Sequence, residues 1–332
     1  MKRRAAVGAL VACASCASVP RFDGPLAVRN QHPAQLTVQR LSPRSAEVLD
    51  ASTARVDLST AYSSYFLSGS DSRGSFIMDG ELLRTAAAVR VGLGGGFDVA
   101  AELPVLHASG GFLDDFVVDW HDWFGFPDQG RDAAPSDAVA IRAVRDGATV
   151  FEVEPNGLHL GDVPIVLTFA PWSIDAEHRV GVALRGGVEL PAGDEDAGFG
   201  NGGIDAALGV VCELRTGPIA WTAQAAHSFA RTPDRARAAG LAFGDVSSFD
   251  LGAEVALADS CSFLVQTQYE SSTLRGLGFG RAADDQWLLW IALRHRLSDG
   301  TRLEWGLGED LSGYIAPDFS AWLSVTMDVG PH

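Results

Sequence analysis

The sequence predicts an all-β protein, an up-and-down antiparallel transmembrane β-barrel of about 12 to 14 strands with a short loop helix near residues 112–124. Two observations predict this fold. Apolar and polar residues alternate along successive segments of roughly ten residues, as in strands with one apolar and one polar face. Short turns also alternate with long polar loops between these segments, which is typical of barrels whose strands cross a membrane.

The composition and charge of the chain argue against two classes of protein, those that bind nucleic acid and those that span the inner membrane with helices. The chain has 332 residues, with 42 acidic against 25 basic residues and a formal net charge of −17. This charge argues against nucleic acid as a partner, because no basic surface is available to displace phosphate counterions. No apolar run after the N-terminus reaches the roughly 20 residues that a membrane-spanning helix needs. A helical inner-membrane protein is therefore not expected.

The N-terminus, MKRRAAVGALVACASCASVP, has basic residues, a short apolar run and then small residues. This order predicts an export signal over residues 1–19. Leu10–Cys13 resembles a bacterial lipobox that would place a lipid on Cys13, whereas cleavage after small residues such as Ala17-Ser18 is the plainer interpretation. After the signal we expect a periplasmic segment over 20–53 and an outer-membrane barrel over 54–330 in a Gram-negative cell.

The strands are predicted by period-two alternation. In 180–190, for example, Val180, Val182 and Leu184 alternate with polar positions that include Arg185 and Glu189. The same pattern recurs at 204–214, 249–257, 263–270 and 319–329. How residues 150–153 and 158–169 divide into strands stays open. A secreted β-sandwich also alternates, but nearest-neighbour connections favour the barrel.

The connections between the segments are of two kinds. Tight hairpin turns are predicted at 94–96, 215–217, 258–260 and 298–300. Long polar loops are predicted at 68–79, 110–127, 191–203, 232–244, 271–284 and 308–318. Tryptophans near strand ends, Trp287, Trp290, Trp305 and Trp322, are expected in the aromatic girdles at the membrane surfaces.

Charged residues on the polar side predict a water-filled lumen. The residues expected to line it or to form a constriction are Asp98, Glu102, Asp119, His121, Arg131, Arg185, Glu189, Glu254, Glu270, Arg302 and Glu304. An acidic lining raises the local concentration of cations. Small cationic solutes or divalent cations, together with outer-membrane lipid, are therefore the expected partners.

The stretch GGFLDDFVVDWHDWFGFP, residues 110–127, combines aromatic residues at helical spacing with carboxylates on the other side. Ser109 is placed to cap this amphipathic helix, and Gly125 and Pro127 end it. The helix is expected either to fold into the barrel mouth or to lie on the rim with its aromatics toward lipid. A metal site at Asp114, Asp115, Asp119 and Asp122 is a weaker reading than a solvated acidic face.

Three further motifs are weighed against plainer interpretations. Residues 198–203 satisfy GxGxxG, but a strand follows where a dinucleotide site needs a helix. His227 and Ser228 are adjacent on a strand and so point to opposite faces, which prevents them from acting as base and nucleophile. Cys212 and Cys261 are either a disulfide or two unpaired residues.

Several stretches together resemble a family of uncharacterised bacterial proteins, domain of unknown function 3187. They are residues 25–33, 78–81, the stretch from 110 through Gly130-Arg131, 189–194 with 198–205, 309–311 and 316–319. The resemblance spans essentially the whole mature chain. It implies an outer-membrane β-barrel and no activity, so no catalytic residue is carried over.

The function expected from the sequence is passive: a pore, a transport component or a structural barrel, with no cofactor and no catalytic residue. Two alternatives remain. One is a barrel-embedded lipid hydrolase, which would depend on His121 or His227. The other is a soluble extracytoplasmic β binding domain.

Overall fold

The structure, a computed structural model, describes residues 21–72, 74–125, 130–131, 134–153, 155, 157–174, 178–277 and 280–330. The expected export signal over 1–19, with Cys13, and Pro127 lie outside the described residues. Among the residues that the structure describes, no helix is long and apolar enough to span a bilayer.

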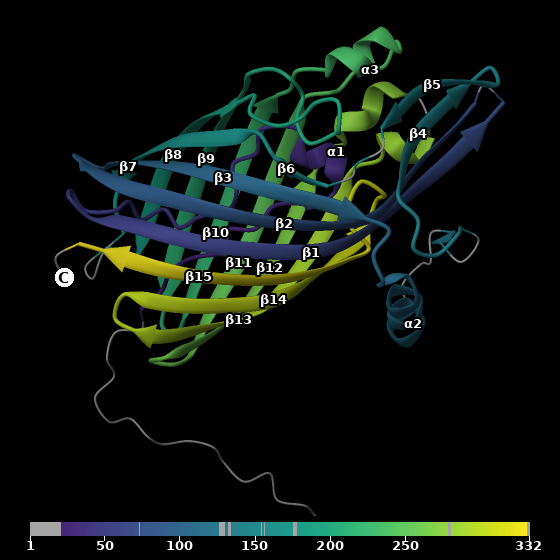
Figure 1. Cartoon of the computed structure of the whole chain (residues 1–332). Coiled ribbons are helices and arrows are strands. Elements are labelled where there is room, and N and C mark those ends of the chain that lie inside the picture. Colours follow the sequence, from purple (N-terminus) through teal and green to yellow (C-terminus); the bar gives the residue numbers. More distant parts are fainter. Residues whose placement is uncertain are drawn as a thin grey trace, which may run out of the picture.

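Twelve antiparallel strands form a closed barrel (Figure 1), which confirms the predicted fold. They are β1 (Ala54–Asp71), β2 (Gly74–Gly94), β3 (Phe97–Ser109), β7 (Val163–Trp172), β8 (Val180–Leu190), β9 (Asp205–Thr216), β10 (Ile219–Phe229), β11 (Val246–Ala258), β12 (Cys261–Glu270), β13 (Gln286–Ser298), β14 (Thr301–Ser312) and β15 (Phe319–Val329). Neighbours in the wall follow chain order, β3 pairs with β7, and β1 pairs with β15 to close the cylinder.

The long connection between β3 and β7 holds three extra strands, β4 (Ala140–Arg145), β5 (Ala148–Val153) and β6 (Leu158–Leu160). β4 pairs with the part of β2 that extends beyond the barrel. The prediction of a loop over 68–79 is therefore wrong: β1 and β2 continue through it as a hairpin, because Phe76 and Met78 pack with Ile141 of β4 in one apolar cluster.

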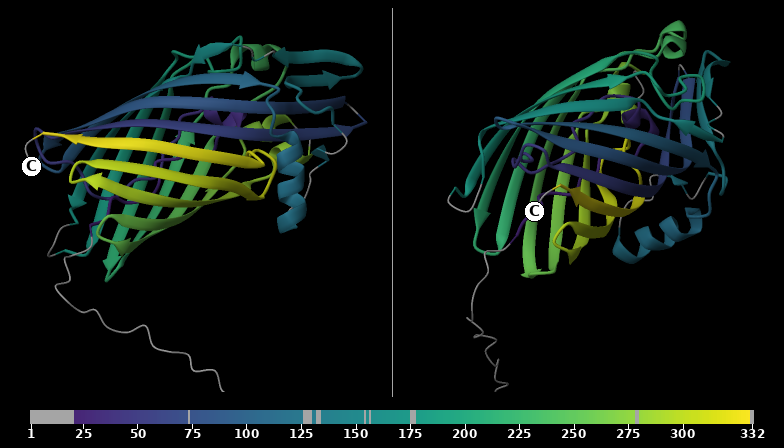
Figure 2. Two further views of the ribbon diagram at one scale, coloured as in Figure 1. Left: turned by 60° about the horizontal axis from the view of Figure 1, so that its bottom comes forward. Right: turned by 60° about the vertical axis from the view of Figure 1, so that its left-hand side comes forward.

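Two rims with different connections bound the barrel (Figure 2). At the short-turn rim lie the predicted turns that join β2 to β3, β9 to β10, β11 to β12 and β13 to β14, together with the start of β1 and the end of β15. Gly94, Gly95 and Gly96 have φ of 81°, 63° and 81°, values that favour glycine in so tight a turn. The long-loop rim carries α3 (Asp234–Ala238) and the 3-10 turns η2 (Thr273–Leu277) and η3 (Gly280–Ala283).

The outer surface of the barrel is apolar and its interior is polar. Leu58, Leu208 and Leu323 point outward and are 57%, 63% and 45% exposed. The residues that alternate with the outward-facing ones along each strand face inward. Among them, Arg294, Glu254 and Gln268 are almost fully buried. This inside-out distribution fits a wall with hydrocarbon outside it and polar groups inside it, which is the opposite of a soluble sandwich.

Of the four tryptophans expected in the aromatic girdles, two face outward and two face inward. Trp287 and Trp305 face outward and are 39% and 46% exposed, as expected. Trp290 and Trp322 instead face the interior and join an apolar cluster with Leu26 and Val28. Their inward direction follows from strand register, and the N-terminal segment supplies the apolar contacts that bury them.

Candidate functional site

The interior of the barrel is occupied by the segment between residue 21 and the start of β1. The expectation of a periplasmic segment over 20–53 did not anticipate this placement. Residues 28–41 are all buried except Leu36. We call residues 21–49 the plug. In Figure 1 its purple trace runs within the barrel, with the short helix α1 (Pro33–Leu36) toward the long-loop rim.

The first arm of the plug runs along the strands β11 to β14. Backbone amides of Asp23 and Gly24 each donate to Glu254 at 2.9 Å. The Asp23 carboxylate pairs with Arg296 at 3.0 Å and with Arg302 at 2.9 Å. Further in, Gln268 donates to the carbonyl of Val28 at 2.9 Å, so the arm is held by polar contacts at several heights.

The plug reverses direction at α1, near the long-loop rim. His32 precedes the helix, and its Nδ1 accepts from the Ala34 amide at 3.3 Å. Burial lowers the pKa of His32 to about 3, so its ring is neutral at physiological pH. Asn30 donates to the carbonyl of Ile315 at 2.7 Å. Because its ring is neutral, His32 adds no charge to the tip of the plug at physiological pH.

The second arm descends along β7 to β10 and back to β1. Arg185 donates to the carbonyl of Ser42 at 2.6 Å, and Glu213 accepts from the hydroxyl of Ser45 and from the Ala46 amide. The Leu49 amide donates to Asp98 at 3.2 Å. Both ends of the plug thus reach the short-turn rim, beside a cavity of about 1350 Å³ whose lining includes Asp23, Glu47 and Arg90.

Two plug arginines neutralise an acidic band of the wall, defined here as Glu189, Asp250 and Glu270. Arg40 pairs with Asp250 at 2.6 Å and with Glu270 at closer range, while Arg29 lies 3.7 Å from Glu189. All five side chains are at most 6% exposed. Among the described residues, the ion pairs of this band are with the plug alone. The plug therefore supplies the ion-pair partners of the wall at this height, where Gln224 of the wall also donates to Asp250 at 3.2 Å.

Most of the residues predicted to line the lumen face it. Asp98, Arg185, Glu189, Glu254, Glu270, Arg302 and Glu304 are buried on the inner side of the wall, and Glu102 pairs there with Arg84. Many of these charges are paired: Arg90 with Asp98, for example, and Arg294 with Glu254 and Glu304. The interior that the structure describes is a paired ionic network rather than a simple acidic lining.

Asp119, His121 and Arg131 do not lie in the lumen, contrary to the prediction. Asp119 and His121 belong to α2 (Asp114–Phe124), which lies against the outside of the wall at the long-loop end (Figure 2). Phe116 and Trp120 of α2 contact Phe319 at the start of β15. Arg131 is buried between Asp114 and Asp318, 2.7 Å from the latter. The helix was predicted, and it lies outside the lumen as in the rim alternative, but two of its aromatic residues, Phe116 and Trp120, pack against the wall.

The start of α2 is capped from a distant strand. Glu81 of β2 accepts from the amides of Phe112 and Leu113, whereas Leu113, not Ser109, stands at the N-cap. Gly125 ends the helix in the left-handed conformation, as predicted. Glu81 replaces the expected serine cap because β2 brings its carboxylate to the free amides.

The acidic residues proposed as metal ligands are not grouped. Asp114 is turned toward Arg131 and the Asp137 amide, while Asp115, Asp119 and Asp122 are exposed on α2. In the part of the chain that the structure describes, no group of three or more His, Cys, Asp or Glu side chains is arranged to hold a metal ion.

Docking of α2 is expected to weaken as pH rises. His121 Nε2 lies 3.3 Å from Glu309 of β14. Burial lowers the pKa of His121, but the hydrogen bond and charge of Glu309 raise it more, so the net pKa lies above the ordinary 6.5. Protonated His121 stabilises the docked helix. This stabilisation is complete below the ordinary histidine pKa and is lost as the pH rises through the raised pKa of the docked state. A spin label at Asp122→Cys should gain mobility over that range, and His121→Gln should remove this pH dependence.

His227 has a serine partner that the sequence did not indicate. Ser247, its direct partner across the β10–β11 ladder, places Oγ 3.0 Å from His227 Nδ1. Asp245 Oδ2 lies 3.9 Å from His227 Nε2. Ser228 is buried on the inner side, so the prediction that it cannot pair with His227 is confirmed. The three residues lie on the outer surface beside the exposed Phe229 and Phe249.

The remaining motifs have structural roles. Residues 198–203 form part of the loop between β8 and β9, where Asp162 accepts from the amides of Gly193 and Asn201 at 2.8 Å and 3.1 Å. A strand rather than a helix follows this GxGxxG sequence, as predicted. Cys212 and Cys261 are both free thiols, which resolves the alternative left open for them.

The chain matches one family model and is similar in fold to a solved outer-membrane channel. The model of a family described as protein of unknown function (DUF3187) matches residues 6–328. The COG4313 outer membrane channel from Pseudomonas putida F1 is 11% identical with a TM-score of 0.56, and the match covers 87% of this chain and all of that one. The NanC porin is 10% identical with a TM-score of 0.47 over 82% of this chain and 98% of its own. No curated protein matches the chain. The likeness to the COG4313 channel shows the fold.

Proposed function

We propose that this chain, which belongs to the family of proteins of unknown function DUF3187, is an outer-membrane channel for small cationic solutes, closed in this state by its own plug. The apolar outer surface supports a place in the membrane, with the long-loop rim outside the cell. Since the plug enters and leaves at the short-turn rim, it can be withdrawn on the periplasmic side without breaking the ladder of the wall.

The acidic band is the observation that carries the proposal. Glu189, Asp250 and Glu270 are neutralised by Arg29 and Arg40 of the plug. When the plug leaves, these carboxylates face the lumen without their partners, and a guanidinium or ammonium solute can take the place of the arginines. The wall arginines near the short-turn rim remain paired with wall carboxylates such as Glu304 and Asp328.

The channel lacking residues 21–49 is expected to prefer cations. In planar bilayers under a KCl gradient, its reversal potential should have the sign of K⁺ selectivity, and Asp250→Asn with Glu270→Gln should reduce that preference. Asp299→Asn, in an exposed turn outside the lumen, is the control for loss of a carboxylate away from the acidic band. Selectivity for anions, or a selectivity that the two band substitutions leave unchanged, would contradict the proposal.

A second candidate function rests on Ser247, His227 and Asp245. Ser247 Oγ is placed to give its proton to His227 and attack the carbonyl carbon of a lipid ester, and the protonated His227 then gives that proton to the leaving alcohol, which leaves the acyl group on Ser247. Water that gives a proton to His227 then attacks this acyl ester, and the fatty acid departs as Ser247 takes the proton back. Asp245 has to approach from 3.9 Å to orient the ring, and catalytic contacts do tighten on substrate binding in many enzymes.

Phospholipid hydrolysis by the purified chain in mixed micelles is the test of this second function. Ser247→Ala should abolish release of fatty acid, while Ser228→Ala, next to His227 but on the inner side, should leave it unchanged. If no hydrolysis occurs, or if Ser247→Ala retains it, the cross-strand contact is structural only.

A further inference from the structure

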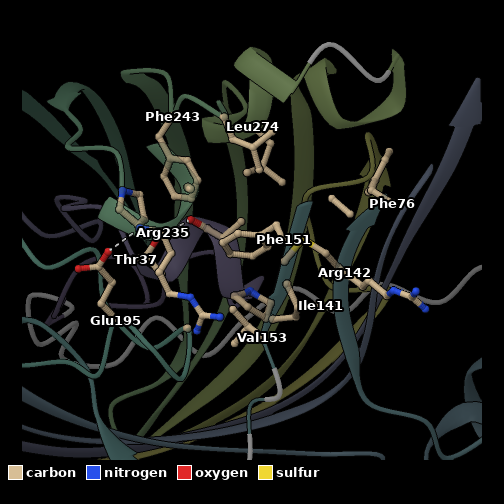
Figure 3. A pocket seen from close by; sticks show the side chains of 18 of the residues that line it. Thr37, Phe76, Ile141, Arg142, Phe151, Val153, Glu195, Arg235, Phe243 and Leu274 are labelled. Carbon is tan, nitrogen blue, oxygen red and sulfur yellow. Dashed lines mark hydrogen bonds between the residues drawn. The ribbon is translucent and has the colours of Figure 1, made fainter. Parts of the chain in front are cut away.

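A small apolar cavity lies at the long-loop rim, directly against the tip of the plug. Its volume is about 80 Å³, and side chains from several elements surround it. Figure 3 shows Phe76 of β2, Ile141 of β4, Phe151 of β5, Leu274 of η2 and Phe243 of the loop after α3 around it. We call it the mouth cavity. Hydrocarbon and ring atoms dominate its lining, although it lies at the mouth of a polar lumen.

The charged groups at its edge, Glu195, Arg235 and Arg142, are already bonded elsewhere, Arg142 by donating to the hydroxyl of Thr149 at 3.0 Å. Glu195 accepts from the backbone amides of Asp234 and Arg235 at the start of α3. The Arg235 guanidinium donates to the carbonyls of Asp196 and Glu152, each at 2.9 Å. Thr37 donates its hydroxyl proton to the carbonyl of Ala34 at 3.0 Å. A ligand of this cavity is therefore recognised by apolar contact and shape, not by charge.

The plug forms one wall of the mouth cavity. Pro33 and Ala34 of α1, with Thr37 just after the helix, line it from the lumen side. The remaining walls belong to β2, β4, β5 and the loops of the rim, which are outside the plug. The complete cavity exists only while α1 is in place, so a molecule that fills it contacts both the plug and the wall.

We propose that the mouth cavity binds a small uncharged apolar molecule, of the size of xenon or a few-carbon hydrocarbon, and that its occupancy holds the plug in the lumen. An engineered apolar cavity of about 150 Å³ binds benzene or xenon, and this one is smaller and partly open to solvent. Because the ligand binds the closed state and loses a wall in the open state, it shifts the equilibrium toward closure.

The effect of the ligand on channel closure rests on the proposed channel function, whereas binding of the ligand to the mouth cavity does not. For a ligand that binds only the closed state, the ratio of closed to open channels rises by a factor of 1 + [L]/Kd, about elevenfold at ten times Kd. By the same linkage, displacing the plug weakens binding of the ligand.

Binding is tested by diffraction from crystals of the full chain under xenon pressure. An anomalous peak is expected between Phe151 and Ala34. Ala143→Leu, which fills the cavity from β4 and leaves the residues of the plug unchanged, should remove the peak, and Phe151→Ala, which enlarges it, should strengthen the peak. Absence of xenon in both the native chain and Phe151→Ala would overturn the site.

Coupling is tested by bilayer recordings of an Arg40→Ala chain, whose plug is loosened. Xenon at saturating pressure should lower its open fraction severalfold, and Ala143→Leu should lower it without xenon and remove the response to the gas. A cavity that binds xenon while the open fraction stays constant would overturn the coupling and leave the site. A channel that never conducts, with the xenon peak present, would instead count against the proposed function.

Discussion

Deleting residues 21–49 should convert a closed barrel into an open pore. The deleted residues fill the lumen, whereas the hydrogen bonds of the wall run between strands from β1 to β15 and do not involve them. A closed ladder keeps every backbone group of the wall paired without the plug. Planar bilayer recordings are expected to show steady open-channel steps for the deletion variant and long closed periods for the full chain.

The control for this deletion is a heat-modifiable gel shift, which reports whether the barrel has folded. A folded deletion variant with no more conductance than the full chain would mean that something other than the plug closes the lumen. A full chain that already conducts as well as the deletion variant would mean that the plug does not obstruct it.

Replacing Arg40 by alanine should release the plug. The substitution leaves Asp250 and Glu270 buried without their cation. Removing one partner of a buried ion pair costs about 3–5 kcal/mol, which corresponds to a shift of roughly two to four powers of ten in an equilibrium constant. Withdrawal of the plug hydrates both carboxylates, so the cost is expected to appear as channel opening rather than as unfolding of the wall. The open fraction in bilayers measures it.

Two further variants test whether the unpaired charges of Asp250 and Glu270 cause the opening. Adding Asp250→Asn and Glu270→Gln to Arg40→Ala removes the unpaired charges and should restore much of the closed population. Arg237→Ala breaks an exposed pair with Asp234 on α3 and an exposed hydrogen bond to the carbonyl of Thr232, both away from the plug. Exposed pairs contribute about 0–1 kcal/mol, so the open fraction of this variant should match that of the native chain. If Arg40→Ala stays as closed as Arg237→Ala, the acidic band does not hold the plug.

The strands could be predicted because their pattern is local. Each has an apolar outer face, so alternation and turn residues are sufficient to place segments such as 249–257 and the turn at 298–300. Helix α2 was equally local, since its aromatic spacing and Gly125 define it. The eight wall residues that were correctly expected to face the lumen followed from the same alternation.

The features that were missed depend on contacts between distant residues. The plug has no period of its own, and its path is set by partners such as Glu254, Asp250 and Glu213, some two hundred residues away. The cap that Glu81 gives to α2 and the pairing of Ser247 with His227 both require the strand register. The arginines between the export signal and the first strand were the feature from which the plug could have been predicted, since a lumen with many carboxylates needs cations.

The position of the plug as the gate can be tested most directly with a reversible lock. A Cβ placed on Gly252 of β11 lies 3.4 Å from the Cβ of Pro25 in the plug, near the roughly 3.5–4.5 Å that a disulfide spans. The measurement is single-channel conductance of Arg40→Ala carrying Pro25→Cys and Gly252→Cys, with Cys212 and Cys261 replaced by alanine. Silence when the pair is oxidised and open-channel steps after reduction are the predicted result; equal conductance in both states would contradict a plug that closes the lumen.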